Sequence, residues 1–369
     1  MTAREKIGQL FMVGFAGTSV TKELSSWIST YRPGGVILFS RNLHSLDQIV
    51  RLTNKLQGLV SSHPLFIAVD QEGGRVSRLP RGFTVFPPCA VLGRCDSSEL
   101  AYAAASATAA ELRAVGINMN LAPVLDINTN RRNPIIGDRA FSSSATQVSA
   151  LGLATLAGLQ DNKVIACGKH FPGHGDTEAD SHEELPTVTL AADRLREVEL
   201  RPFRHAIENG LASIMTAHVR YTALDDGRPA TLSSYILTEI LRNELGFEGL
   251  VLTDDLEMHA IVHHHEIGDA AVLAFRAGAD VLLVCADRDR AAAAIDAVHQ
   301  AVKEGHISEA RIEASVQRII QAKRRFLEPY TPVALRGAKE VVGRKAHKTL
   351  LQSILESSEQ HRRDWVASR

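Results

Sequence analysis

Residues 164–170 read VIACGKH, and this short stretch decides the fold class. Its first five residues are apolar or small without alternation, which is typical of a strand buried on both faces of a parallel sheet. The run then ends on Lys169 and His170, whose polar groups need partners if they are buried. The stretch therefore predicts an internal parallel strand with chemically useful groups at its carboxyl end.

Seven other apolar runs have the same form, at residues 12–16, 34–40, 65–70, 117–124, 213–219, 249–255 and 280–285. Amphipathic stretches separate these runs, and several stop at a glycine that can cap a helix, namely Gly210, Gly246, Gly278 and Gly305. One helix is expected to begin with a capping box formed by Asp96 and Glu99. Eight strands alternating with helices predict an α/β fold, a single (β/α)8 barrel over residues 1–328. A doubly wound open sheet is the alternative, because strand counts inferred from sequence carry error.

The pattern changes after residue 328. Residues 329–369 contain no further strand–helix unit and predict a linker followed by a helical, basic tail. The apolar residues of this tail fall on one helical face: Leu350, Leu351, Ile354 and Leu355. We expect this C-terminal helix to pack on the barrel or on a partner subunit, with a solvated tail as the alternative.

Composition excludes several classes of protein. The formal net charge of the 369 residues is −1, so no overall field attracts nucleic acid or an anionic membrane. The four cysteines form no CxxC pair, and a reducing compartment fits them better than a disulfide framework. The N-terminus lacks the layout of a signal peptide, and no run approaches the roughly 18 apolar residues of a membrane span. We expect a cytoplasmic protein, a monomer or weak homodimer, with neither nucleic acid nor membrane as a partner.

Polar residues stand repeatedly at the ends of the predicted strands. They are Asp70, Asn120, Asp126, Lys169, His170, His218, Asp254 and Asp255. The active sites of (β/α)8 barrels are built at the carboxyl ends of the strands. These residues are therefore the first candidates for an active site.

The segment VLTDDLEM, residues 251–258, ends an apolar strand on two carboxylates. An unpaired buried charge costs several kcal/mol, so a carboxylate in this place indicates use. We expect Asp254 to face the mouth of the barrel. The alternative, stronger for Asp255, is a helix N-cap, a position where Asp is favoured.

Two loops offer groups that can bind a ligand. In AVDQEGGRVSRLP, residues 68–80, Asp70 can accept and an arginine such as Arg78 can donate hydrogen bonds to vicinal hydroxyls. A surface ion pair is the alternative. In NPIIGDRAFSS, residues 133–143, Arg139 can reach a substrate hydroxyl or carboxylate, or else pair with Asp138 or Asp126.

The histidine-rich segments allow two kinds of site. KHFPGHGDTEADSHEELP, residues 169–186, offers metal ligands in His170, His174, Asp176, Asp180 and His182. The alternative is a proton-transfer pair, because Asp180 and His182 point to the same side of an extended loop. A second segment, HAIVHHHE at residues 259–266, invites a zinc interpretation, but it lacks the glutamate of HExxH and is better explained as a loop lining the cleft.

Taken together, KHFPGHGDTEADSH, VLTDDLEM, VDQEGGRVSRL, IIGDRAFSS and IMTAHV resemble the bacterial β-N-acetylglucosaminidases of glycoside hydrolase family 3. The resemblance runs through residues 6–325. It implies that Asp254 is the catalytic nucleophile, that His182 is the general acid/base and that Asp180 is its dyad partner. It also implies that a ring of N-acetylglucosamine is held by Asp70, Arg78, Arg139, Lys169 and His170.

The resemblance further implies a retaining double displacement on a peptidoglycan fragment, with no metal and no cofactor. Phosphate could replace water in the second step, because a neutral histidine would not repel it, so a phosphorylase is one alternative. A metal-dependent barrel hydrolase and a catalytically silent sugar-binding barrel are the others.

Overall fold

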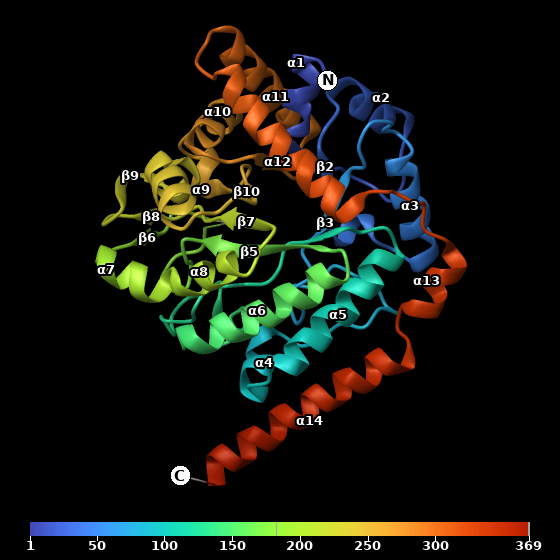
Figure 1. Cartoon of the computed structure of the whole chain (residues 1–369), viewed down its shortest axis with the longest axis vertical. Helices are drawn as coiled ribbons and strands as arrows, with labels where there is room; N and C mark the ends of the chain where they lie inside the picture. The colour runs from blue at the N-terminus through green and yellow to red at the C-terminus, as the bar shows by residue number, and fades with distance from the viewer. Residues whose placement is uncertain (182, 368–369) are drawn as a thin grey trace.

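Eight parallel strands close into a barrel at the centre of the computed structural model, which describes residues 1–181 and 183–367 (Figure 1). In chain order the strands are β1 (Phe11–Val13), β2 (Gly35–Leu38), β3 (Phe66–Val69), β4 (Met119–Asn120), β5 (Ile165–Phe171), β7 (Ser213–Thr216), β10 (Leu250–Asp255) and β11 (Val281–Val284). Each strand pairs with its neighbours along the chain, and β1 pairs with both β2 and β11. The closed ring confirms the predicted (β/α)8 barrel over an open sheet.

The strands are shorter than the apolar runs that predicted them, most clearly at β4. The run at 117–124 gives only a two-residue strand, Met119–Asn120. Pro123 lies in the rest of that run and has no N–H to donate to a neighbouring strand. Pairing with β5 resumes as a single bridge between Val124 and Lys169.

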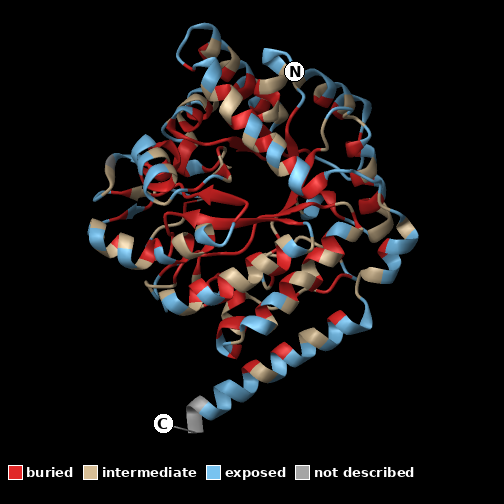
Figure 2. Ribbon diagram, viewed as in Figure 1, coloured by how far each residue is buried: buried red, intermediate tan, exposed pale blue. Residues whose placement is uncertain are grey.

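Helices surround the barrel and bury one face each against it (Figure 2). They are α1 (Ala3–Gln9), α2 (Lys22–Tyr31), α3 (Leu46–Gln57), α4 (Cys89–Cys95), α5 (Ser98–Ala114), α6 (Ala145–Asp161), α8 (Arg201–Glu208), α10 (Ile267–Ala277), α11 (Arg288–Lys303) and α12 (Glu309–Leu327), with the π-helical segment η5 (Tyr235–Glu244). In α3, for example, Ile49, Leu52 and Leu56 are buried while the opposite face is exposed. The apolar spacing of each helix thus covers the outside of the sheet.

One predicted helix start is wrong by a residue. The N-cap of α5 is Ser97 rather than Asp96. The Ser97 hydroxyl accepts the backbone N–H of Leu100 at 3.2 Å. Asp96 instead ends α4 in a left-handed conformation, with φ of 47°. A serine competes equally well for the N-cap position, so the sequence spacing alone did not separate the two residues.

The chain between β5 and β10 contains additional short elements after β5 and after β7. A small sheet forms from β6 (Thr187–Val188), β8 (Arg220–Tyr221) and β9 (Asp225–Pro229). Between β6 and α8 lie α7 (Ala192–Arg194) and the π-helical turn η3 (Leu195–Glu199). The small sheet fixes the far end of the long loop that follows β5, because the N–H of Arg220 donates to the carbonyl of Pro186 at 2.9 Å.

The tail forms two helices, α13 (Leu335–Val341) and α14 (Lys345–Ala367), and α14 lies along α4 and α5 (Figure 1). Ile354 is fully buried in that contact, whereas Leu355 is 38% exposed. Buried Glu111 of α5 accepts hydrogen bonds from His347 Nδ1 at 2.7 Å and from the N–H of Gly343 at 3.0 Å. The C-terminal helix therefore packs on the barrel helices, while the domain division at residue 328 stays a prediction.

A single buried carboxylate organises the amino end of β11. Asp280 is fully buried and accepts hydrogen bonds from Arg242 at 2.6 Å, from Arg318 at 3.1 Å and from the N–H of Val251 at 3.0 Å. Arg311 lies 3.7 Å away. Three guanidinium groups thus share one carboxylate, and its removal would leave them without their common counter-ion.

We predict that Asp280→Asn lowers the free energy of unfolding by ~3–5 kcal/mol, the cost of breaking a buried ion pair from one side. Urea unfolding followed by circular dichroism measures the change. The matched control is Asp296→Asn, since Asp296 makes an exposed pair with Arg4 and is expected to cost no more than ~1 kcal/mol. Equal losses in the two variants would contradict the role given to Asp280.

Candidate active site

A cavity of about 210 Å³ opens at the carboxyl ends of the barrel strands. Its polar lining comes from the loop after β3, from the short helix η2 (Gly137–Arg139), from β5 and its loop, and from β10. These residues are Asp70, Arg78, Arg139, Lys169, His170, His174, Ser181, Asp254 and Asp255. Apolar side chains such as Phe39, Met215 and Leu283 form the rest of the wall.

Lys169 is the centre of a buried charge network in this cavity. Its side chain is 2% exposed, and Nζ lies 2.5 Å from both Asp70 Oδ1 and Glu72 Oε1. Arg139 binds Glu72 through two hydrogen bonds of 2.8 Å each, and Arg78 lies 3.3 Å from Asp70. Three cations therefore share two carboxylates, which satisfies the buried lysine and leaves one positive charge in excess.

The ion pairs lower the pKa of Glu72 and raise the pKa of Lys169. Burial alone would raise the pKa of Glu72, but Lys169 and Arg139 hold it well below its usual range. Burial would lower the pKa of Lys169, yet Asp70 and Glu72 raise it. Glu72 and Lys169 are therefore both charged at neutral pH.

The turn at Gly73 and Gly74 presents Asp70 and Glu72 to the same lysine. Gly73 has φ of 103°, and a Cβ there would lie 2.7 Å from the carbonyl oxygen of Pro87. Only glycine fits both the conformation and the space. Asn120 clamps the turn by exchanging two hydrogen bonds with the backbone of Gln71, at 3.0 and 2.9 Å.

His170 is oriented by a second buried carboxylate, Asp126. The ring Nδ1 of His170 lies 2.6 Å from Asp126 Oδ2, and the backbone N–H of His170 donates to Asp126 Oδ1 at 3.1 Å. His170 Nε2 then faces the cavity, 3.4 Å from a nitrogen of Arg139. Since the Arg139 nitrogen donates, Nε2 is an acceptor and Nδ1 carries the proton.

The two aspartates that end β10 differ in charge state. Burial would raise the pKa of Asp254, but His218, His170, the N–H of Asp255 and Lys169 together lower it. Burial raises the pKa of Asp255 to about 7, and the nearby Asp254 adds to that shift. Asp254 is thus an ionised carboxylate in the cavity, ready to act as a nucleophile or a counter-charge.

Asp255 has a structural task that the sequence did not identify correctly. Its Oδ1 accepts the N–H groups of Glu257 and Cys285, at 3.1 and 3.2 Å. The following helix, α9 (His259–Val262), starts after Met258 and has no side-chain cap. Asp255 therefore holds a turn against β11 and is not the N-cap of a helix.

The loop after β5 carries the remaining predicted residues. His174 is buried, and its Nε2 lies 3.1 Å from the hydroxyl of Ser181. The carbonyl of Asp180 accepts the N–H groups of Glu183 and Glu184, at 3.0 and 2.9 Å. The predicted acid/base His182 lies outside the described residues, so the geometry of the predicted pair Asp180–His182 stays open.

The structure thus brings the five predicted ring-binding residues and Asp254 to one cavity. The predicted partners of Arg139, Asp138 and Asp126, are wrong: Arg139 binds Glu72, and Asp138 pairs with Arg75 at 3.2 Å. Glu72 was missed by the sequence reasoning. The i+2 spacing from Asp70 within the VDQEGG turn was the available signal.

The histidine run after β10 takes no part in the cavity, contrary to expectation. His263 and His264 are exposed. The cavity lining includes Met258, which precedes the histidine run, but none of the histidines at 259–265. The rings of His259 and His263 stack at 4.6 Å on α9. Among residues 1–181 and 183–367, no group of three or more His, Cys, Asp or Glu residues is arranged to hold a metal ion.

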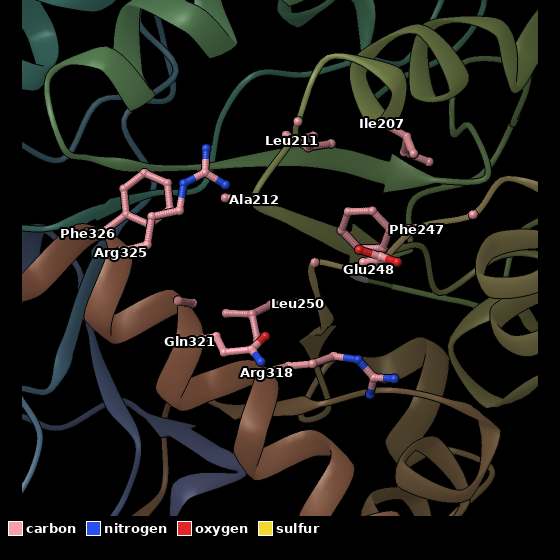
Figure 3. Close-up of a pocket in the computed structure, with 14 residues that line it drawn as sticks. Ile207, Leu211, Ala212, Phe247, Glu248, Leu250, Arg318, Gln321, Arg325 and Phe326 are labelled. Atoms are coloured by element: carbon pink, nitrogen blue, oxygen red, sulfur yellow. The ribbon is translucent and has the colours of Figure 1, made fainter.

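A second hollow, of about 330 Å³, lies at the opposite ends of β7 and β10 (Figure 3). Its lining includes Phe247 and Glu248, and also Arg318 and Arg325 of α12 (Figure 3). Barrel enzymes place their chemistry at the carboxyl ends of the strands, whereas the other end contributes stability. We therefore assign the active site to the smaller cavity.

A buried acid lies under the loop after β5. Glu199 is 1% exposed, and its nearest cation is Arg194, at 3.6 Å. A Cβ on Gly173 of the loop would lie 3.0 Å from the Glu199 side chain. Burial raises the pKa of Glu199 to about 7, Arg194 opposes that shift, and Asp176 and Asp126 add to it.

Comparison with known proteins places this barrel in a family. Residues 2–322 match the glycosyl hydrolase family 3 N terminal domain. The match, together with a barrel whose mouth gathers carboxylates and cations, defines a glycoside hydrolase. The chain belongs to glycosyl hydrolase family 3.

The relatives include bacterial β-hexosaminidases. The β-hexosaminidase A of Pseudoalteromonas piscicida is 36% identical, over 95% of this chain and 65% of that protein. A family 3 β-N-acetylglucosaminidase from Paenibacillus sp. str. FPU-7 is 43% identical with a TM-score of 0.91, over 97% of this chain and 69% of that one. NagZ from Neisseria gonorrhoeae, solved with N-trifluoroacetyl-D-glucosamine, is 32% identical with a TM-score of 0.76, over 95% and 98%.

This chain therefore spans about two thirds of the first two relatives, at 65% and 69%, and 98% of the third. The predicted resemblance to the bacterial β-hexosaminidases of family 3 is confirmed. Within the described residues, none of the helices combines the length and the apolar character that a membrane crossing requires.

We predict that Glu199 makes the stability of the protein depend on pH. The folded protein keeps the Glu199 proton up to about pH 7, whereas the unfolded chain releases it near pH 4. The folded state therefore binds more protons between these values, and the free energy of unfolding must fall as the pH rises through them. Glu199→Gln is expected to make this slope less negative by at most ~1.4 kcal/mol per pH unit, while Asp255, whose pKa burial also raises to about 7, keeps its own contribution.

Urea unfolding at pH 5, 6 and 7 measures the effect. The matched control is Glu184→Gln, in which an exposed acid of the neighbouring segment is neutralised. A slope in Glu199→Gln equal to that of the wild type would show that Glu199 does not contribute to it.

Proposed function

We propose that this chain is a retaining exo-β-N-acetylglucosaminidase that releases terminal β-linked N-acetylglucosamine from peptidoglycan fragments. One observation carries the proposal. Asp254 is an ionised carboxylate at the end of β10, in the same cavity as the Lys169 charge network. Ser181, the residue between Asp180 and His182, lines that cavity as well.

The cavity suits one sugar ring. Its volume of about 210 Å³ is below the roughly 300–1,000 Å³ of pockets for drug-sized ligands. Carboxylates such as Asp70 can accept from ring hydroxyls, while Arg78, Arg139 and Lys169 can donate to them. His170, fixed by Asp126, lines the cavity beside Arg139. A site of this size favours removal of a single terminal residue.

The proposed reaction has two displacements. In the first, Asp254 attacks the anomeric carbon, the bond to the leaving oxygen breaks, and His182 gives that oxygen a proton. In the second, His182 takes a proton from water, and the water oxygen displaces Asp254, so the configuration is retained. Asp180 would orient the imidazole and stabilise its protonated form. No metal or cofactor takes part in this scheme.

The choice of sugar is supported by relatives that are described as β-N-acetylglucosaminidase or were solved with an N-acylglucosamine. The peptidoglycan fragment and a cytoplasmic role in wall recycling rest on the resemblance of the sequence motifs. Product analysis with and without inorganic phosphate separates hydrolysis from phosphorolysis.

We predict that a 5-fluoro derivative of an N-acetylglucosaminide labels Asp254. The fluorine makes the second displacement slower than the first, so the glycosyl-enzyme accumulates. Mass spectrometry of the digested protein locates the label. Asp255→Asn, the neighbouring carboxylate, should still be labelled, and Asp254→Asn should not. Label on any other residue would overturn the proposed nucleophile.

We predict that His182→Ala slows kcat/KM on substrates with poor leaving groups by about 10²–10⁴-fold, the usual contribution of a general acid. Dinitrophenyl N-acetyl-β-glucosaminide, whose leaving group needs no proton, should react nearly as in the wild type. His264→Ala removes an exposed histidine outside the cavity and serves as the control. An equal loss on both substrates would exclude the acid role of His182.

A further inference from the structure

His174, which the sequence offered only as a possible metal ligand, lies against Ser181 in the segment of residues 180–182 that carries the proposed acid–base pair, here called the acid–base segment. The N–H of His174 donates to Asp126 at 2.7 Å, and its carbonyl accepts from Asn133 Nδ2 at 2.8 Å. Its ring packs edge-on against His170, with centroids 5.7 Å apart. His174 is therefore held by several contacts at the barrel mouth, on the same carboxylate that orients His170.

The proton of the His174 ring can be assigned from its neighbours. Nδ1 lies 2.9 Å from the hydroxyl of Thr177, and that hydroxyl donates to the carbonyl of His174 at 3.2 Å. A hydroxyl has one proton to donate, and with that proton on the carbonyl of His174 the Thr177 oxygen accepts from Nδ1–H. Nε2 then has a lone pair, and the only way to satisfy the 3.1 Å contact is for Ser181 to donate its hydroxyl proton to it.

The charge state of His174 agrees with this assignment. Burial lowers the pKa of His174 to about 4, His170 and Arg139 act in the same direction, and Asp126 opposes them. The ring is therefore neutral at the pH values where most enzymes work, and Nε2 keeps its lone pair.

Ser181 is the residue through which this contact acts on the chemistry. It is 3% exposed, it lines the cavity that contains Asp254, and it stands between the two residues of the proposed acid–base pair. A hydrogen bond at the Ser181 hydroxyl therefore restrains the position of Ser181.

We propose that His174 is a positioning residue, which holds the acid–base segment over the cavity by accepting a hydrogen bond from the Ser181 hydroxyl. This inference rests on the proposed function, because it needs His182 to deliver a proton. Without the bond, the segment spends less time in the place where His182 can reach the leaving oxygen. Only reactions that need that proton should be slowed.

The test is a series of aryl N-acetyl-β-glucosaminides with leaving groups from poor to good, measured as kcat/KM so that the first displacement is observed. In Ser181→Ala and in His174→Phe we expect a loss of about two- to tenfold on the poorest leaving groups, the range for one neutral hydrogen bond. The best leaving groups should react as in the wild type. The double variant should lose no more than either single variant, because both remove the same bond.

Two further variants separate positioning from a general structural effect. Thr177→Val removes the acceptor that fixes the His174 tautomer, and it is expected to show a smaller loss with the same dependence on the leaving group. Ser149→Ala is the matched control, since Ser149 is also buried and its hydroxyl donates to the carbonyl of Ala145 within α6 at 2.7 Å. If His174→Phe does not fold, Ser181→Ala and Thr177→Val carry the test.

Each outcome has a fixed meaning. An equal loss on all leaving groups in Ser181→Ala, or no loss at all, overturns the positioning role. His182→Ala is measured in the same series as a reference. If it depends on the leaving group and Ser181→Ala does not, the positioning role alone fails. If His182→Ala shows no such dependence, the acid role fails and the positioning role fails with it.

Discussion

The contact of Lys169 with Asp70 and Glu72 is the interaction on which the barrel mouth depends. A lysine that is 2% exposed would not remain charged without partners, because burial disfavours the charged form. Its two carboxylates come from one turn after β3, and Glu72 in turn fixes Arg139 from another loop. One buried ammonium group on β5 thus ties two loops to that strand. The polar wall of the cavity is therefore held by ion pairs between the protein's own side chains.

The same network sets the charge of the carboxylates that end β10. Lys169, His170 and His218 lie close enough to lower the pKa of Asp254, whereas the pKa of Asp255 rises to about 7 beside it. Two adjacent residues of one type thus have different states, because one faces the cations and the other faces a turn and a second carboxylate. This separation of pKa values is typical of acids with different tasks in one site. It supports the assignment of Asp254 to chemistry and of Asp255 to structure.

The sequence predicted the barrel because its strands are uninterrupted apolar runs, and it located the cavity because polar residues follow those runs. It did not predict which groups meet across the mouth. Arg139 binds Glu72, which is 67 residues away, and no local spacing encodes that pair. The start of α5 at Ser97 differs from the expected cap by one residue, because both candidates suit an N-cap. The histidines of residues 259–265 are dense in sequence, but α9 turns them away from the cavity. Pairing and direction depend on tertiary contacts, which a pattern of residue types does not contain.

The two halves of the loop after β5 share one support. Asp126 accepts hydrogen bonds from the ring and backbone of His170 and from the backbone of His174. His170 faces the proposed sugar position, and His174 faces Ser181 in the acid–base segment. The positions of His170 and of Ser181, which precedes the proposed proton donor in the chain, are therefore both set from one buried carboxylate. A catalytic group needs such a fixed reference, because a 1 Å error in its position can reduce the rate about 10²-fold. Asp126 and His174 provide that reference without a direct part in bond breaking.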